Sequence, residues 1–288
     1  MSEDPDTFSS PILPGSLLPP PPPRRIPNFG DAVLFFTVAF IVMLFTSISV
    51  FAMAMGFHWF GTETAEQLLR EPRLIIPAMA VGYLIAGAMV WAIFTYLWRQ
   101  SFSNALHWNF DVVRRRWPWL LGGGAVLSLG VQFLSNFLPI PKSLPIDDFF
   151  RTSADVWMVA LFGTFVAPLF EELAFRGFLV PSLASAWDWL QGRRDQARLG
   201  SDPQWSIAAL GVSCIVTSIA FALVHADQLA HAWAPLAVLF TVSLVLCAVR
   251  LWTQSLAASA MIHATYNGTI FTIVFFGTGG FRHLDKIT

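Results

Sequence analysis

Long apolar stretches follow one another along the chain and are separated by short polar segments. Each is close to the roughly 20 residues that a helix needs to cross a bilayer. They lie at residues 31–57, 74–98, 118–139, 156–180, 205–226, 233–252 and 255–277. We therefore predict an all-α fold, a polytopic transmembrane helical bundle of about seven spans. The close spacing around residues 226–254 leaves room for six to eight.

Composition supports a membrane protein. Hydrophobic residues make up 55% of the chain and charged residues only 12%, against about 25% in a typical soluble domain. The lipid bilayer is therefore the first partner we expect. The net charge of -1 gives no reason to expect a nucleic acid partner. Cys214 and Cys247 lie inside apolar runs and form neither a metal-type spacing nor a disulfide framework.

The two ends of the chain differ from its middle. The segment "SSPILPGSLLPPPPPRRIPNFG" is rich in Pro, Ser and Gly and has no apolar core of the length that a signal sequence needs. We predict a disordered Pro-rich tail over residues 1–30, the helical bundle over 31–280 and a short C-terminal tail over 281–288.

Positive charge falls in alternate loops between the predicted spans. By the positive-inside rule, these basic loops face the cytoplasm. The N-terminus is then predicted to be cytoplasmic and, with seven spans, the C-terminus lies outside. We expect an integral, multi-pass membrane protein, in the cell inner membrane if the source is bacterial. The arginines concerned are Arg24, Arg25, Arg114, Arg115, Arg116, Arg193, Arg194, Arg198 and Arg250.

The segment "EELAFRG" places charges beside the fourth apolar run. A charge near the bilayer centre costs at least about 2.5–3.5 kcal/mol, so three together need an explanation. Glu172 and Arg176 stand four apart in the favourable order for a helical ion pair, which predicts a structural role for them. Glu171 lies about 100° around the helix and needs a partner of its own. Pro168 predicts a kink just before these carboxylates.

Polar residues also occur inside later spans. His225 lies near the end of the fifth apolar run, and His263 lies inside the seventh. Asn267 follows His263 by four residues and so shares its helix face. A single intramembrane histidine is as consistent with a structural hydrogen bond as with catalysis. A set of Glu, His, His and Asn on three spans favours a polar site, and we predict that Glu171, His225, His263 and Asn267 converge on one cavity.

Three short motifs occur in order on successive spans: Glu-Glu-x-x-x-Arg in "EELAFR", Phe-x-x-x-His in "FALVH" and His-x-x-x-Asn in "HATYN". In this order the chain resembles the CAAX protease and bacteriocin-processing family, also called the Abi family. These proteins are intramembrane endopeptidases and include the eukaryotic type II CAAX prenyl endopeptidase. The resemblance covers about residues 150–280.

The resemblance implies a role for each motif residue. Glu171 would be the general base that activates a water molecule, and His225 would help to hold that water. His263 and Asn267 would donate hydrogen bonds to the oxyanion of the tetrahedral intermediate. Glu172 and Arg176 would support the site structurally. The implied substrate is a membrane-associated peptide or protein, either prenylated or of the leader type.

Other functions remain open on the sequence alone. A proton-coupled transporter would also carry intramembrane Glu and His, and a non-catalytic scaffold or immunity protein could share the fold. Within the enzyme class, zinc is possible as a cofactor, with Glu171, His225 and His263 as ligands. No "HEXXH" or similarly tight spacing occurs. We prefer a mechanism without a metal or other cofactor.

One consequence of the predicted spans is inconsistent with a shared site. A fourth span from residue 156 and a fifth from residue 205 would place Glu171 and His225 on the order of 20 Å apart in depth. The simplest correction starts the fifth span near residue 212 and lets it run past His225 into "ADQLAHAW".

Overall fold

The structure, a computed structural model, describes residues 27–61, 64–193 and 205–286. Throughout this part of the chain the regular elements are helical, which confirms the predicted all-α class. The α-helices are α1 (Phe29–Gly56), α2 (Ala65–Leu68), α3 (Pro72–Trp98), α4 (Phe102–Ala105), α5 (Phe110–Ser135), α6 (Ser153–Leu161), α7 (Ala167–Glu172), α8 (Val180–Leu190), α9 (Ile207–Leu223), α10 (Trp233–Thr253) and α11 (Leu256–Gly277). The 3-10 and π segments are η1 (Pro145–Phe150), η2 (Phe162–Val166), η3 (Leu173–Leu179), η5 (Asp227–Leu229) and η6 (Leu284–Lys286).

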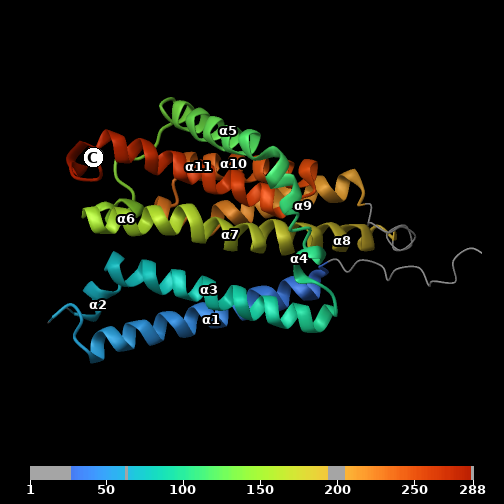
Figure 1. The fold of residues 1–288 in the computed structure, drawn as a ribbon, viewed down its shortest axis with the longest axis horizontal. Coiled ribbons are helices and arrows are strands. Elements are labelled where there is room, and N and C mark those ends of the chain that lie inside the picture. The colour runs from blue at the N-terminus through green and yellow to red at the C-terminus, as the bar shows by residue number, and fades with distance from the viewer. Residues whose placement is uncertain (1–26, 62–63, 194–204, 287–288) are drawn as a thin grey trace, which may run out of the picture.

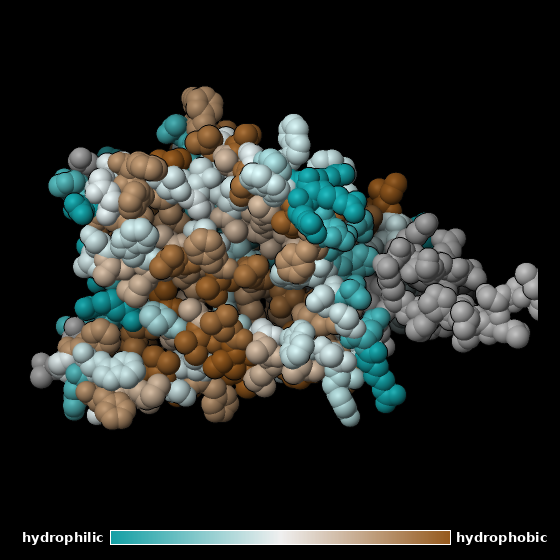
Figure 2. Space-filling model, in the orientation of Figure 1, coloured by the Kyte–Doolittle hydropathy of each residue, from teal (hydrophilic) through white to brown (hydrophobic). Residues whose placement is uncertain are grey.

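Each of the seven predicted spans overlaps a helix, although α5 begins at Phe110 and ends at Ser135 rather than at residues 118 and 139. In the described residues, five helices are long and apolar enough to cross a membrane: α1, α3, α5, the continuous helix from α6 to α8, and α10. The apolar helix α9 is shorter, at 17 residues. The space-filling view shows hydrophobic surface across the middle of the molecule and hydrophilic groups toward both ends (Figure 2). This distribution fits a bundle surrounded by lipid.

The predicted N-terminal tail ends two residues too late, because α1 already begins at Phe29. The cap explains this start: the side chain of Asn28 accepts a hydrogen bond from the backbone of Asp31, and the Asp31 carboxylate accepts one from the backbone of Asn28. Residues 1–26 of the predicted tail lie outside the described residues.

The long helix from α6 to α8 runs through the middle of the bundle (Figure 1). On one side α1 packs along α3, and on the other α5 packs along α11 and α9 packs along α10. Buried aromatic rings join the α1–α3 pair to the long helix. The ring of Phe178 lies 4.5 Å from that of Phe35 and 4.8 Å from that of Phe94, and all three are fully buried. Because lipid tails are themselves apolar, close packing of these rings rather than their removal from water holds the helices together.

A close approach between α5 and α11 depends on Gly124. A Cβ at this position would lie 2.6 Å from the Cβ of Thr265 and 2.8 Å from the carbonyl oxygen of Ile262. Only a glycine allows the two backbones to come this close, as small residues commonly do between membrane helices. Because Ile262 directly precedes His263, this contact also fixes the position of the histidine's helix.

The long helix contains two π-helical segments, and each is followed closely by a proline. Pro168 follows η2, and Pro181 follows η3. A proline lacks a backbone N–H and crowds the carbonyl four residues earlier, so an ordinary α-helical ladder cannot pass through it. At the place where we predicted a kink, the structure has the π segment η2, a feature frequent at functional sites.

The predicted end of the fourth span, residue 180, is ten residues too early because the helix continues to Leu190. Near that end, the Asp188 carboxylate accepts hydrogen bonds from the backbone N–H of Ser206 at 2.9 Å and from its hydroxyl at 2.6 Å. Glu171 precedes Asp188 by 17 residues and His225 follows Ser206 by 19. At 1.5 Å per residue these distances are about 26 and 29 Å, so the predicted depth difference disappears.

The correction proposed from the sequence for the fifth span is therefore wrong. Helix α9 begins at Ile207, not near residue 212, and ends at Leu223 before it reaches His225. A turn follows, in which Ala230 and His231 both have positive φ angles of 52° and 54°. The fourth span was misjudged because its last turns carry Trp, Ser and Asp, which lower the hydropathy although the helix continues.

Candidate active site

The two adjacent glutamates lie at the end of α7, directly before the π segment η3. Glu172 and Arg176 are both 0% exposed, and their side chains form an ion pair with an Nη1–Oε1 distance of 2.9 Å. This is the i, i+4 pair expected from the spacing. Glu171 points in a different direction and its side chain is 15% exposed. The two carboxylates therefore have separate environments, as their positions on the helix predict.

Glu172 accepts hydrogen bonds from three side chains. Its Oε1 atom lies 2.9 Å from Nη1 of Arg176 and 2.9 Å from Nδ1 of His263. Its Oε2 atom accepts the hydroxyl proton of Ser259 at 2.5 Å. Such a set of donors compensates a buried carboxylate for the water that it lacks. One result is that α7 is tied to α11 at the level of His263.

His263 is the residue that brings Glu171 and Glu172 into one site. Its Nε2 atom lies 3.6 Å from Oε2 of Glu171, while its Nδ1 atom is bound to Glu172. The imidazole is 3% exposed. The Arg176 guanidinium balances the charge of Glu172, whereas Glu171 has no ion pair other than the contact with His263 among the described residues. The imidazole of His263 lies between these two glutamates.

His225 lies in the turn after α9, close to the same group. Its Nδ1 atom lies 2.8 Å from the carbonyl oxygen of Phe221. The Phe221 ring lies 5.0 Å from the His225 ring and 5.8 Å from the His263 ring. Phe221 thus contacts both histidines, and the guanidinium of Arg176 lies over its face at 4.9 Å.

Asn267 makes a contact that the sequence does not predict. Its Nδ2 atom donates a hydrogen bond of 2.7 Å to the carbonyl oxygen of Gly163, which belongs to η2. The backbones are close here, since a Cβ on Gly268 would lie 3.1 Å from the Thr164 methyl group. One of the two amide N–H groups of Asn267 therefore has a structural role, and the other is available for a ligand.

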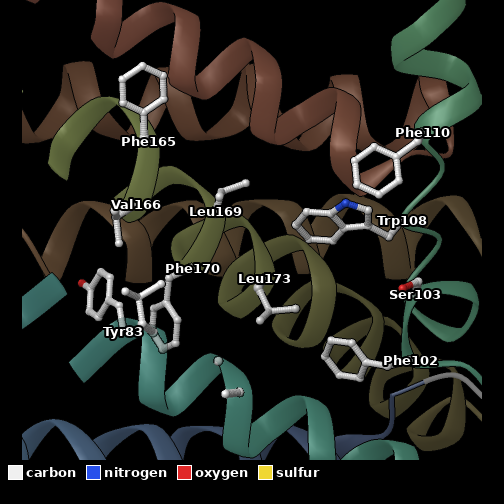
Figure 3. Close-up of a pocket in the computed structure, with 13 residues that line it drawn as sticks. Tyr83, Phe102, Ser103, Trp108, Phe110, Phe165, Val166, Leu169, Phe170 and Leu173 are labelled. Carbon is white, nitrogen blue, oxygen red and sulfur yellow. The ribbon is translucent and has the colours of Figure 1, made fainter. Parts of the chain in front are cut away.

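An apolar cavity of about 490 Å³ lies on the side of the long helix that faces α3, between α3, α4 and α7 (Figure 3). None of the four predicted catalytic residues is among those that line it, so they do not line this cavity together. The cavity is nevertheless lined by Phe170, the residue directly before Glu171 in the chain. The lining is Tyr83, Leu84, Gly87, Ala88, Phe102, Ser103, Trp108, Phe110, Phe165, Val166, Leu169, Phe170 and Leu173.

Tyr83 connects the cavity to Glu171. Its ring stacks on that of Phe170 at 4.3 Å (Figure 3). It also lies 5.5 Å from the ring of Phe162. It is also close enough to interact electrostatically with the Glu171 carboxylate. Sequence reasoning missed Tyr83, and nothing in its apolar surroundings on α3 could have indicated it.

Ser259 was also missed, although a signal was present. It precedes His263 by four residues, so it lies on the same face of α11, one turn away. The run of small residues around it indicated only close helix packing.

Glu171, His225 and His263 are the zinc ligands that the sequence left possible, and they would have to lie together to bind the ion. Within residues 27–61, 64–193 and 205–286, no three His, Cys, Asp or Glu side chains are grouped so that they could hold a metal ion. The Nδ1 atom of His225 is bound to a backbone carbonyl, which leaves Nε2 as the nitrogen of this ring that could act as a ligand. As arranged in the structure, Glu171, His225 and His263 do not form a three-ligand group of this kind.

Comparison with known families bears on this part of the chain. Residues 153–269 match the family model described as type II CAAX prenyl endopeptidase Rce1-like. Over these residues the chain is similar to an Rce1-like domain. The matched region runs from the start of α6 into α11 and contains all of Glu171, His225, His263 and Asn267. Helices α1, α3 and α5 lie outside it.

A curated relative is similar over a comparable length. An uncharacterized 24.3 kDa protein of Escherichia coli is 27% identical over 158 residues, which is 54% of this chain and 63% of that protein. The match thus spans less than two thirds of the relative's length. No solved structure matches the chain.

Proposed function

We propose that this chain is an intramembrane endopeptidase that hydrolyses a peptide bond of a membrane-associated peptide, with Glu171 as the general base. The observation that carries the proposal is the contact of Glu171 with Nε2 of His263 at 3.6 Å, while Nδ1 of the same ring is bound to Glu172. A carboxylate and an imidazole held at this separation can both bind one water molecule. The similarity to an Rce1-like domain supports the same class of activity.

The reaction would proceed in two steps. Glu171 takes a proton from the bound water as its oxygen attacks the scissile carbonyl carbon, and a tetrahedral oxyanion forms. The oxyanion then collapses, the C–N bond breaks, and the proton held by Glu171 passes to the leaving amine. The products are a carboxylic acid and an amine, which ionise to carboxylate and ammonium.

The other polar residues would assist this sequence. The free N–H of Asn267, whose other N–H is fixed by Gly163, would donate to the oxyanion. His263, whose Nδ1 proton is held by Glu172, would accept a hydrogen bond from the water at Nε2. His225 would hold the water from the side of Phe221. Glu172 and Arg176 would fix the helix and the His263 ring.

The apolar cavity beside Phe170 indicates the kind of substrate. It is lined almost entirely by hydrophobic side chains, among them Phe170, which directly precedes Glu171 in the chain. It would therefore accept an apolar chain or apolar side chains close to the scissile bond, as in a prenylated peptide or an apolar leader. We further propose that the reaction needs no metal, because the residues above supply a base and an oxyanion donor without one.

Orientation belongs to the same proposal. The end of α3 and the start of α8 lie at the same end of the bundle as the start of α1, because the Trp98 indole donates to the Asp31 carboxylate and the Ser182 hydroxyl donates to the carbonyl of Asn28. The loop between α3 and α5 and the segment between α8 and α9 therefore begin at this end. We propose that this end is cytoplasmic and that a bacterial host would place the protein in its inner membrane. Reporter fusions in these two loops should both give a cytoplasmic signal.

The decisive experiment compares cells that contain the wild-type protein with cells that contain Glu171→Gln. The variant keeps the shape of the side chain but cannot take a proton, so a peptide cut by the enzyme should persist in the variant alone. Glu66→Gln is the matched control, because Glu66 is 80% exposed and lies far from the site in the chain.

Two outcomes would contradict the proposal. If the peptide profiles of Glu171→Gln and wild type are the same while a phenotype of the deletion is restored by both, the protein acts as a scaffold. If Glu171→Gln instead abolishes proton-coupled uptake of a solute, it is a transporter.

A further inference from the structure

We infer that Ser259 is a positioning residue of this site: it orients the Glu172 carboxylate, which in turn fixes the His263 ring with Nδ1 toward Glu172 and Nε2 toward Glu171. The inference deepens the proposed function and rests on it only for the effect on cleavage. No motif discussed above includes Ser259.

The geometry at Glu172 carries the inference. Oε1 is shared by Arg176 and His263, each at 2.9 Å. Oε2 has one donor among the described residues, the hydroxyl of Ser259, which is itself 0% exposed. Without that hydroxyl, Oε2 would be a buried carboxylate oxygen with no partner, and the carboxylate could rotate to share Arg176 between both oxygens. Such a rotation would withdraw Oε1 from His263.

The ring orientation follows from the same contacts. A carboxylate accepts hydrogen bonds and cannot donate them, so the Nδ1 atom that faces Glu172 must carry a proton. A neutral imidazole has only one N–H, so a proton fixed on Nδ1 leaves Nε2 as the atom that meets Glu171 and its water. Partners of this kind commonly fix the tautomer and orientation of a functional histidine.

Arg176 is held by a second serine, but in a different manner. Its Nη2 atom donates to the hydroxyl of Ser243 at 2.7 Å and to the backbone carbonyl of the same residue at 2.9 Å. Removal of the Ser243 hydroxyl leaves the carbonyl in place as an acceptor. Ser243→Ala should therefore disturb the site less than Ser259→Ala, since no second donor replaces the Ser259 hydroxyl.

The first test does not require a substrate. The protein is labelled with [¹⁵N]histidine, reconstituted in lipid vesicles and studied by NMR, and His263 is assigned by the loss of its signal in His263→Asn. The wild type should show one state with a protonated Nδ1. Ser259→Ala should replace this state with a mixture of two tautomers. Ser213→Ala is the matched control, because Ser213 is equally buried but bonds only to the carbonyl of Ala209 in its own helix.

The second test measures cleavage of a quenched fluorescent farnesylated peptide by the same samples. Ser259→Ala should lower kcat about 10-fold and leave KM unchanged, as loss of an orienting partner typically does. Ser243→Ala should lose less, and Ser213→Ala should match the wild type.

The outcomes separate the inference from the proposed function. An unchanged Nδ1 signal in Ser259→Ala would overturn the positioning role, whatever happens to cleavage. If the wild type does not cut the farnesylated peptide, that substrate fails, and the NMR comparison still decides the role of Ser259. If Ser259→Ala simply fails to fold, all histidine signals broaden, and Ser259→Cys, which keeps a weak donor of similar size, provides the comparison. If folded Ser259→Cys also lacks the wild-type Nδ1 state, positioning by the hydroxyl is supported. If it keeps that state undiminished, the hydroxyl is not required.

Discussion

Replacement of Arg176 by alanine removes the cation from an ion pair whose two side chains are both 0% exposed. Glu172 would be left with His263 and Ser259 as donors but without a full positive charge beside it. Loss of one partner of a buried pair costs about 3–5 kcal/mol. For a chain of this size, each kcal/mol lowers the melting temperature by about 2–4 °C, so Arg176→Ala should lower it by roughly 6–20 °C.

The chain offers a closely matched control in the pair Glu66–Arg70. It has the same i, i+4 spacing and order, but its side chains are 80% and 70% exposed and the N–O distance is 3.4 Å. Exposed helical pairs of this kind contribute only about 0.3–0.5 kcal/mol, so Arg70→Ala should change the melting temperature by about 2 °C or less.

The assay is thermal unfolding of the purified protein in detergent, followed by the fluorescence of its 12 tryptophans. The double variant Glu172→Gln with Arg176→Met removes both charges and should recover at least half of the lost stability, because it leaves no unpaired buried ion. If Arg176→Ala melts within about 2 °C of Arg70→Ala, or if the double variant is less stable than the single one, the reasoning from burial is wrong.

Three further predictions concern the site and its helices. Tyr83→Phe keeps the aromatic stack but removes a hydroxyl that interacts electrostatically with Glu171, the proposed general base, so cleavage should fall at least about 10-fold. Tyr96→Phe, at an exposed position of the same helix, should have no effect; equal rates would refute this. Gly124→Ala should destabilise the protein in thermal unfolding by about 1–3 kcal/mol, because the new Cβ would lie 2.6 Å from that of Thr265. Gly122→Ala, whose Cβ would have nothing within 4 Å, should stabilise the protein by about 0.5–1 kcal/mol. The opposite order of stabilities would refute the close approach. Exhaustive chelation should leave cleavage unchanged, and a loss that zinc restores, with about one zinc per chain, would show that the metal-free proposal is wrong.

Much of the fold was predictable because apolar runs of bilayer length leave a chain few alternatives to helices. The ends of the individual helices were less predictable. The fourth helix continues past residue 180 to Leu190, and this extension removes the difference in depth between Glu171 and His225. Hydropathy reports where lipid contact ends, but a helix can continue into water when its polar groups find partners, as Asp188 does with Ser206.

The ion pair of Glu172 and Arg176 could be predicted because both residues lie on one helix, where the spacing alone fixes the distance. Contacts between helices could not be predicted in this way. The hydrogen bond from Asn267 to Gly163 needs a π segment in one helix and a close approach in another. Neither feature has a reliable signal in the sequence.

The sequence by itself determined that the chain is a helical membrane protein and which charged and polar residues must be explained within its spans. The reason is energetic, since each such residue in lipid carries a cost that is visible from composition alone. Only the tertiary structure decided which partner each residue has: Ser259 for Glu172, Tyr83 near Glu171, and His263 between the two carboxylates. These pairings depend on how helices distant in sequence are packed, and small residues such as Gly124 set those distances to within a fraction of an ångström.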